Sequence, residues 1–297
     1  MKILITGAKG QLGSELTSIL KSKKSEIGAI SPLYDKCEIV AADADTLDIT
    51  DALKVNSFLE DFAPDVVINC AAMTNVDGCE TNLELAMRVN AIGPLNIARA
   101  CKKIGAKLVH VSTDYVFDGK NSSPYREWDI CAPNSIYGKS KLLGEQYVRE
   151  QTCRYFIVRT AWLYGYTGHN FVRTILKLAK EKDQIKVVND QVGNPTNAND
   201  LAHHILKMAV TDNYGIYHCT GAGEASWFEF ASLIVKYAGL KCEVVPCGTS
   251  EFPKVAKRPN FSALDNLTLR CAVGDEMRPW QDALLTYINT LKKENDL

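Results

Sequence analysis

The chain has 297 residues, of which 46% are hydrophobic and 23% charged, a composition typical of a folded globular protein with one large α/β domain and a smaller lobe. Its formal net charge of -1 excludes nucleic acid and anionic membrane surfaces as main partners, because either would need a concentrated basic face. No apolar run approaches the roughly 20 residues that span a bilayer, which excludes a membrane-spanning protein.

The N-terminus and the cysteines both predict a cytosolic protein. Residues 1–7 read as a folded strand, since they lack the longer apolar core and small-residue cleavage site of a signal peptide. The ten cysteines are dispersed and form no Cys-x-x-Cys pair. We expect buried free thiols in a reducing compartment, with a disulfide between Cys242 and Cys247 as the alternative.

Short β-branched runs alternate with helical stretches through the first half of the chain. The predicted strands cover residues 2–6, 38–42, 65–69, 107–111 and 154–159, and the predicted helices cover residues 11–23, 51–62, 83–104 and 135–150. Strands that are apolar on both faces belong to a parallel sheet covered by helices, so the pattern predicts a doubly wound, Rossmann-like α/β fold. We expect residues 1–160 to bind a dinucleotide and residues 161–297 to form mainly a smaller C-terminal substrate-binding lobe, with some segments free to rejoin the main sheet.

A glycine-rich turn separates the first predicted strand from the first helix. It reads Gly7, Gly10 and Gly13 in a Gly-x-x-Gly-x-x-Gly spacing, with Gln11 and Leu12 opening the helix. Glycines let backbone N–H groups approach a pyrophosphate, and the helix N-terminus adds unpaired donors. The turn therefore predicts an NAD(P) site; the alternative is a turn that binds nothing.

Acidic residues after the second strand bear on the choice of cofactor. Asp43 can accept a hydrogen bond from a ribose 2′-OH, which favours NADH, while Lys9 could attract a 2′-phosphate and leaves NADPH open. Asp43 lies 30 residues after Gly13 instead of about 20, so we assume that the first helix extends through residues 21–37. Asp48 and Ile49 are expected beside the adenine. The alternatives are a loop acid at Asp43 and a helix cap at Asp48.

Three residues form the predicted catalytic group. Thr113 follows the strand at residues 107–111, where open α/β sheets place their ligands. Tyr137 and Lys141 lie one turn apart on one face of the predicted helix 135–150, so both can reach one carbonyl and the cofactor. We expect the Lys141 ammonium to lower the pKa of the Tyr137 phenol and so match this proton donor to neutral pH.

The chain resembles the dTDP-4-dehydrorhamnose reductases, a family of extended short-chain dehydrogenases, from end to end. The first segments that carry the resemblance mark the superfamily, and the later ones are more specific; they lie at residues 7–13, 69–77, 89–93, 112–117, 137–141, 159–165, 189–196 and 257–259. The resemblance implies NAD(P)H-dependent reduction of the C4 ketone of dTDP-4-dehydro-L-rhamnose to dTDP-L-rhamnose. In that reaction Tyr137 would protonate the developing alkoxide and Lys141 would hold the nicotinamide ribose.

Further site residues follow from the resemblance, position by position. Ala71, Ala72 and Thr74 match a cofactor-lining loop, and Asn90 would fix the catalytic helix and Lys141 through its amide. The expected ligand is a dTDP-linked keto-deoxysugar. Tyr115 and Trp162 are expected to contact its sugar, and its nucleotide diphosphate is expected to contact Asn170, Phe171, Gln191 and Arg258.

The sequence departs from the family pattern at a magnesium site. Some family members dimerise through magnesium held by glutamates, and Glu15 matches one such position, but residues 197–201 contain no glutamate. We therefore predict no metal, and leave open a homodimer without one. The histidines His169, His203 and His204 show no ligand-like spacing.

Two other functions remain open from the sequence. A regulatory subunit of methionine adenosyltransferase shares the expected fold without sugar turnover, although such a binding role would need no proton donor at Tyr137. A reductase or epimerase acting on another nucleotide sugar would carry the same catalytic residues.

Overall fold

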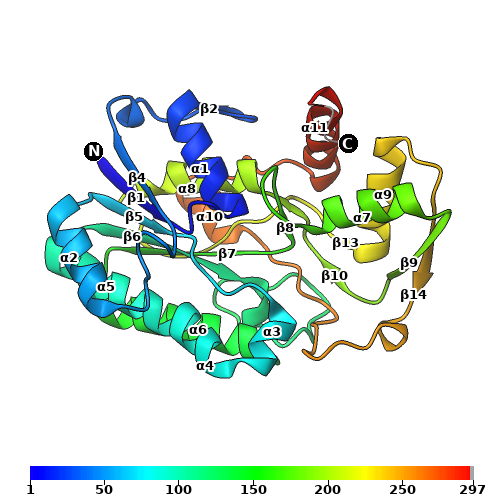
Figure 1. Cartoon of the computed structure of the whole chain (residues 1–297), viewed down its shortest axis with the longest axis horizontal. Helices are drawn as coiled ribbons and strands as arrows, with labels where there is room; N and C mark the ends of the chain where they lie inside the picture. The colour runs from blue at the N-terminus through cyan, green and yellow to red at the C-terminus, as the bar shows by residue number, and fades with distance from the viewer. Residues whose placement is uncertain (295–297) are drawn as a thin grey trace.

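The computed structural model describes residues 1–294. Its centre is a six-stranded parallel sheet in the order β12-β7-β6-β5-β1-β4 (Figure 1). The strands are β1 (Lys2–Thr6), β4 (Glu38–Ala42), β5 (Val66–Asn69), β6 (Lys107–Thr113), β7 (Tyr155–Thr160) and β12 (Gly215–His218). The chain passes from β1 to β4 on one side and then to β5 on the other, which places a topological switch point beside β1.

Helices cover both faces of this sheet (Figure 1). The helices α1 (Gln11–Ser22) and α8 (Ala198–Ala209) pack on one face, and α2 (Ala52–Phe62), α5 (Gly93–Ile104) and α6 (Ile136–Gln151) pack on the other. Because neighbouring strand residues point to opposite faces, Ile3 and Ile5 join the first core and Leu4 joins the second. The predicted doubly wound parallel sheet is confirmed.

The connection from α1 to β4 is not the helical extension that the sequence predicted. Helix α1 ends at Ser22, because Lys23 adopts a left-handed conformation with φ of 61°. The chain then forms the hairpin β2 (Lys24–Ser25) and β3 (Gly28–Ala29) and the 3-10 turn η1 (Pro32–Tyr34). The hydroxyl of Tyr34 donates to the carbonyl of Leu206 on α8, so the extra residues pack beside the main helices instead of lengthening one.

The predicted helix at residues 83–104 is interrupted. It consists of α4 (Leu83–Met87), one π turn, η2 (Arg88–Ile92), and α5, preceded by the unpredicted short helix α3 (Val76–Thr81). A π turn inserts an extra residue into the helix and often occurs at functional sites. Here it turns the amide of Asn90, which is 1% exposed, into the interior.

The second half of the chain forms a lobe beside the sheet's carboxyl edge (Figure 1). Its core packs around Tyr164, Phe230 and Leu284, and a parallel strand pair, β9 with β14, covers it. The further elements are β8 (Leu163–Tyr164), α7 (Phe171–Glu181), β9 (Gln184–Val188), β10 (Val192–Gly193), β11 (Thr196–Asn197), β13 (Ala225–Ser226), α9 (Trp227–Ala238), β14 (Glu243–Cys247), α10 (Leu267–Ala272) and α11 (Trp280–Lys293), with the 3-10 turns η3 (Asp114–Val116) and η4 (Thr249–Glu251). Segments α8, β12 and α10 return to the main sheet, and the division of binding roles at residue 160 stays a prediction.

All ten cysteines are free thiols, including Cys242 and Cys247. Two of them are exposed and three are partly exposed, so the expectation that all are buried is wrong for Cys153, Cys271, Cys37, Cys70 and Cys131. Among residues 1–294, no helix has both the length and the apolar character needed to cross a membrane.

Candidate active site

A cleft of about 720 Å³ opens at the carboxyl edge of the sheet, between the sheet and the second lobe. Every predicted cofactor-binding residue lines it: Gly7, Gly10, Gln11, Leu12, Gly13, Asp43, Asp48, Ile49, Ala71, Ala72, Thr74, Tyr137 and Lys141. Thr113, Tyr115, Trp162, Asn170 and Phe171 line the same cleft, whereas Gln191 and Arg258 lie outside its lining. Residues distant in the sequence thus form one site at the switch point.

The glycine turn has no room for side chains. Gly7 has a φ of +65°, and a Cβ there would lie 2.7 Å from the backbone nitrogen of Ala71, in the loop after β5. A Cβ at Gly13 would lie 2.3 Å from the carbonyl oxygen of Gly7. The three glycines therefore let the turn and α1 approach each other closely, and Gly10 caps an α1 N-terminus that has no side-chain cap. This cradle fits a dinucleotide pyrophosphate.

Asp43 directly follows β4, as predicted, and its carboxylate is tied to the glycine turn. The backbone N–H of Lys9 donates to Oδ2 of Asp43 at 3.0 Å, while the Lys9 ammonium pairs with Asp45 at 2.6 Å. Asp43 thus lines the cleft and also fixes the turn, and its contact with a ribose stays a prediction. Lys9 would have to leave Asp45 to meet a 2′-phosphate.

Asp48 and Ile49 lie on the next loop. Asp48 accepts from the backbone N–H of Thr50 at 2.9 Å, and Asp51, not Asp48, caps α2. The alternative of a helix cap at Asp48 is therefore wrong. The side chain of Ile49 packs against Gly93, where an added Cβ would lie 2.5 Å away.

Thr113, Tyr137 and Lys141 converge in the middle of the cleft. Gly138 lets α6 pack against the turn after β6, because a Cβ there would lie 2.1 Å from the carbonyl oxygen of Tyr115. This contact brings the Tyr137 phenol close to the Thr113 hydroxyl, which donates to Oδ1 of Asp114 at 2.9 Å, and sets its ring edge-on to Tyr115. The ammonium of Lys141 donates to the carbonyl of Val111 at 2.6 Å.

Burial decides the protonation of these groups. It raises the pKa of the Tyr137 phenol, although the Thr113 hydroxyl opposes the rise, and Lys141 is not among the groups that lower this pKa. The prediction that the Lys141 ammonium lowers the pKa of the Tyr137 phenol is therefore wrong. The ammonium is directed to the backbone carbonyl of Val111 instead. Burial also lowers the pKa of Lys141 to about 8, against an opposing effect of the Glu145 carboxylate. Tyr137 is thus a protonated donor at neutral pH.

The π turn supports the catalytic helix. The amide of Asn90 bonds the backbone of Met73 through both its oxygen and its nitrogen, and it donates to Oγ of Ser140 at 3.0 Å. Ser140 in turn donates to the carbonyl of Tyr137. Asn90 therefore connects the cofactor-lining loop to α6, as expected, but it reaches the helix at Ser140 and not at Lys141.

Two stacked indoles form the wall of the cleft on the second lobe. The rings of Trp162 and Trp227 are 3.4 Å apart between centroids and 4° from parallel, and Phe171 packs against Trp227. Trp162 has a φ of 46°, a strained conformation for a bulky residue, and the backbone of Gly193 lies against its ring. Trp227 was missed by sequence analysis, because nothing in its local sequence links it to Trp162.

The residues expected around the nucleotide diphosphate are only partly in the cleft. The amide of Asn170 caps α7 and donates to the carbonyl of Gly165, and Asn170 and Phe171 both line the cleft. Gln191 donates to Oγ1 of Thr249 at 2.9 Å. Arg258 pairs with Asp77 at 3.0 Å.

The position linked to magnesium in some relatives holds polar contacts within the chain. The buried carboxylate of Glu15 accepts from the amide of Asn199 at 2.8 Å. No group of three or more His, Cys, Asp or Glu side chains within residues 1–294 could hold a metal ion.

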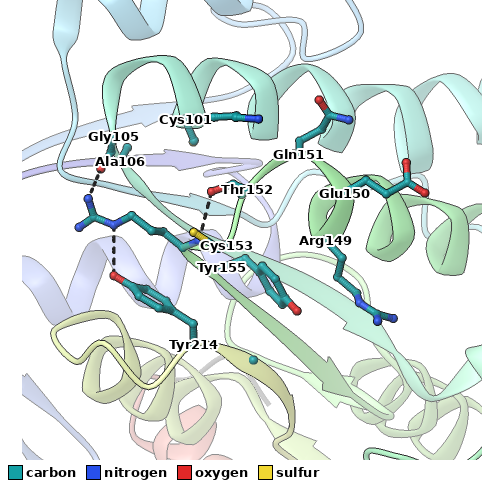
Figure 2. A pocket seen from close by; sticks show the side chains of 13 residues that line it. Cys101, Gly105, Ala106, Arg149, Glu150, Gln151, Thr152, Cys153, Tyr155 and Tyr214 are labelled. Atoms are coloured by element: carbon teal, nitrogen blue, oxygen red, sulfur yellow. Dashed lines mark hydrogen bonds between the residues drawn. The ribbon is translucent and has the colours of Figure 1, made fainter.

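A second cavity, of about 700 Å³, opens at the opposite, amino-terminal edge of the sheet (Figure 2). Arg154 on its wall donates to the Tyr214 hydroxyl at 3.2 Å and to the Gly105 carbonyl at 2.7 Å. None of the predicted site residues line it.

A parallel doubly wound sheet, a glycine cradle at its switch point and a Thr–Tyr–Lys group at its carboxyl edge define an extended short-chain dehydrogenase. The model of the RmlD substrate binding domain family matches residues 1–293.

The similar proteins agree with this class. The chain is 41% identical to the spore coat polysaccharide biosynthesis protein SpsK of Bacillus subtilis, over 97% of this chain and 96% of that one. It is 48% identical to a dTDP-4-dehydrorhamnose reductase solved from Clostridium acetobutylicum, with a TM-score of 0.93 and coverage of 98% and 100%. It is 42% identical to a dTDP-4-dehydrorhamnose reductase of Bacillus anthracis solved in complex with NADP, with a TM-score of 0.90 and coverage of 97% and 99%. The chain belongs to the dTDP-4-dehydrorhamnose reductase family.

Proposed function

We propose that the protein reduces the C4 ketone of dTDP-4-dehydro-L-rhamnose to dTDP-L-rhamnose with NADH, and also with NADPH. One observation carries the proposal: Thr113, Tyr137 and Lys141 line the same cleft as the glycine cradle and the stacked indoles. The relatives named as reductases of this substrate support the choice of sugar.

The side chains divide the chemistry among them. The dinucleotide, when bound, supplies the hydride. Thr113 donates a hydrogen bond that orients the ketone, and Tyr137 gives its proton to the oxygen of C4 as negative charge develops there. Lys141 holds the nicotinamide ribose. The indole of Trp162 offers an apolar face to the deoxysugar.

The proposed cofactor contacts follow the cleft. The backbone donors of the glycine turn hold the pyrophosphate, Asp43 accepts from the ribose 2′-OH, and Ile49 packs against the adenine. A cytosolic location fits the ten free thiols, since such thiols persist in a reducing compartment.

A panel of nucleotide-linked keto-sugars tests the proposal. The purified protein is mixed with each sugar and NADH or NADPH, and the fall in absorbance of the reduced cofactor gives kcat/KM. The expected result is turnover of dTDP-4-dehydro-L-rhamnose at least tenfold above the other sugars. Turnover of a different nucleotide sugar, or none with Tyr137 intact, would contradict it.

A further inference from the structure

Arg258 lies on a segment of the second lobe that is anchored on both sides. The backbone N–H of Ala256 donates to Oδ1 of Asp77 at 2.9 Å, and the N–H of Phe261 donates to the carbonyl of Gly119 at 3.2 Å. A Cβ at Gly119 would lie 2.4 Å from the Pro259 side chain, so this part of the segment packs closely on the chain after β6. The segment has little freedom to move Arg258.

A single carboxylate fixes both the backbone and the side chain of this segment. While Oδ1 of Asp77 accepts from Ala256, its Oδ2 accepts from Nη2 of Arg258 at 3.0 Å. Asp77 belongs to α3, next to Val76, which lines the cleft. The contact therefore joins the cofactor side of the cleft to the second lobe.

The guanidinium of Arg258 keeps one donor for another partner. Its side chain is 18% exposed, yet Nη1 is buried and has no hydrogen-bond partner among residues 1–294. A buried donor without a partner costs free energy, and a ligand that pairs with Nη1 would remove this cost. The guanidinium lies near the cleft, because its partner Asp77 directly follows Val76, which lines the cleft.

We propose that Asp77 is a positioning residue that holds Arg258 with its free Nη1 directed to the diphosphate of the nucleotide sugar. This inference rests on the proposed function, which supplies the diphosphate. Arginine binds phosphate oxygens through a planar fork of donors, and fixing one edge of the fork on a carboxylate orients the other. Asp77 contacts no substrate in this arrangement and acts only through Arg258.

The test measures the affinity for dTDP by calorimetry, and KM and kcat for dTDP-4-dehydro-L-rhamnose. The variants are Asp77→Asn, Asp77→Ala, Arg258→Ala and the double variant Asp77→Asn with Arg258→Ala. The Asn variant can still accept from Ala256 but loses the charge that holds Arg258, so it separates the two contacts of Asp77. Glu60→Gln is the matched control, because it removes one carboxylate from an exposed pair with Lys103 that does not line the cleft.

We expect Asp77→Asn to weaken dTDP binding and to raise KM about tenfold, with kcat and NADH affinity within about twofold of the parent. In the Arg258→Ala background the same change should have no further effect, since coupled residues are non-additive. An Asp77→Asn protein that binds dTDP like the parent, or an additive double variant, would overturn the proposal. A parent that binds no dTDP would contradict the proposed function itself, and with it the ligand of Arg258.

Discussion

Replacing Gly193 by alanine should disturb the sugar side of the cleft without touching any proposed catalytic group. The new Cβ would lie 2.6 Å from Cε2 and Nε1 of Trp162 and 2.9 Å from Cζ2, where about 3.5 Å is the closest comfortable separation. The indole must therefore retreat by almost 1 Å. Its other face is already stacked on Trp227, and β10 is paired with β13, so neither side can yield freely.

The expected cost is that of overpacking, about 1 to 3 kcal/mol. If this whole free-energy cost weakens binding at the sugar subsite, kcat/KM for the keto-sugar should fall between roughly fivefold and 150-fold, mainly through a higher KM. The strained backbone at Trp162 adds to the effect, because the stack that holds this conformation would loosen.

The assay is steady-state reduction followed by NADH absorbance, beside a thermal unfolding curve for each protein. A second substitution gives the control: Trp227→Leu vacates space behind the indole, so Gly193→Ala should cost less in that background than alone. If Gly193→Ala leaves KM, kcat and the unfolding temperature unchanged, the ring of Trp162 is not confined as described.

Three further predictions concern Tyr137, Lys141 and Asp43, all of which line the cleft. Tyr137→Phe should lower kcat at least about a hundredfold while NADH binds as before, measured by fluorescence titration; normal turnover would remove the phenol from the mechanism. Burial lowers the pKa of Lys141 to about 8, so the ammonium is lost as pH rises through that value and kcat/KM should fall there. Lys141→Met should weaken NADH binding and remove that pH dependence, and an unchanged profile would refute the role. Asp43→Ser should reduce or reverse a preference for NADH over NADPH of about tenfold in kcat/KM, and an unmoved ratio would show that Asp43 does not contact the ribose.

The parallel sheet could be predicted because its strands are apolar on both faces and regularly spaced. The predicted bounds of β1 and β4 agree with the structure, and Asp43 follows β4 directly. The glycine turn and the Tyr137–Lys141 pair were also within reach of the sequence, since each motif depends on local spacing. The sequence thus predicted which of these residues line the cleft, and their roles in binding and catalysis stay predictions.

Other features depend on contacts between distant segments and leave no local signal. The 3-10 turn before β4 is held to α8 by the hydrogen bond from Tyr34 to Leu206, which no helical period can show. The pairing of Trp162 with Trp227, and of Asp77 with Arg258, exists only once the second lobe folds against the sheet. The pKa of Tyr137 was misjudged because the sequence does not show how deeply the phenol is buried.

The return of β12 to the main sheet has a consequence for dissecting this protein. A fragment ending at residue 160 would contain every strand of the sheet except β12 and would also lack α8. Its β7 would become an open edge of buried residues such as Ile157 and Val158, with unpaired backbone groups ready to join another chain. The bare cofactor-binding half should therefore aggregate when expressed alone, so the two halves of the cleft can be studied only as one folding unit.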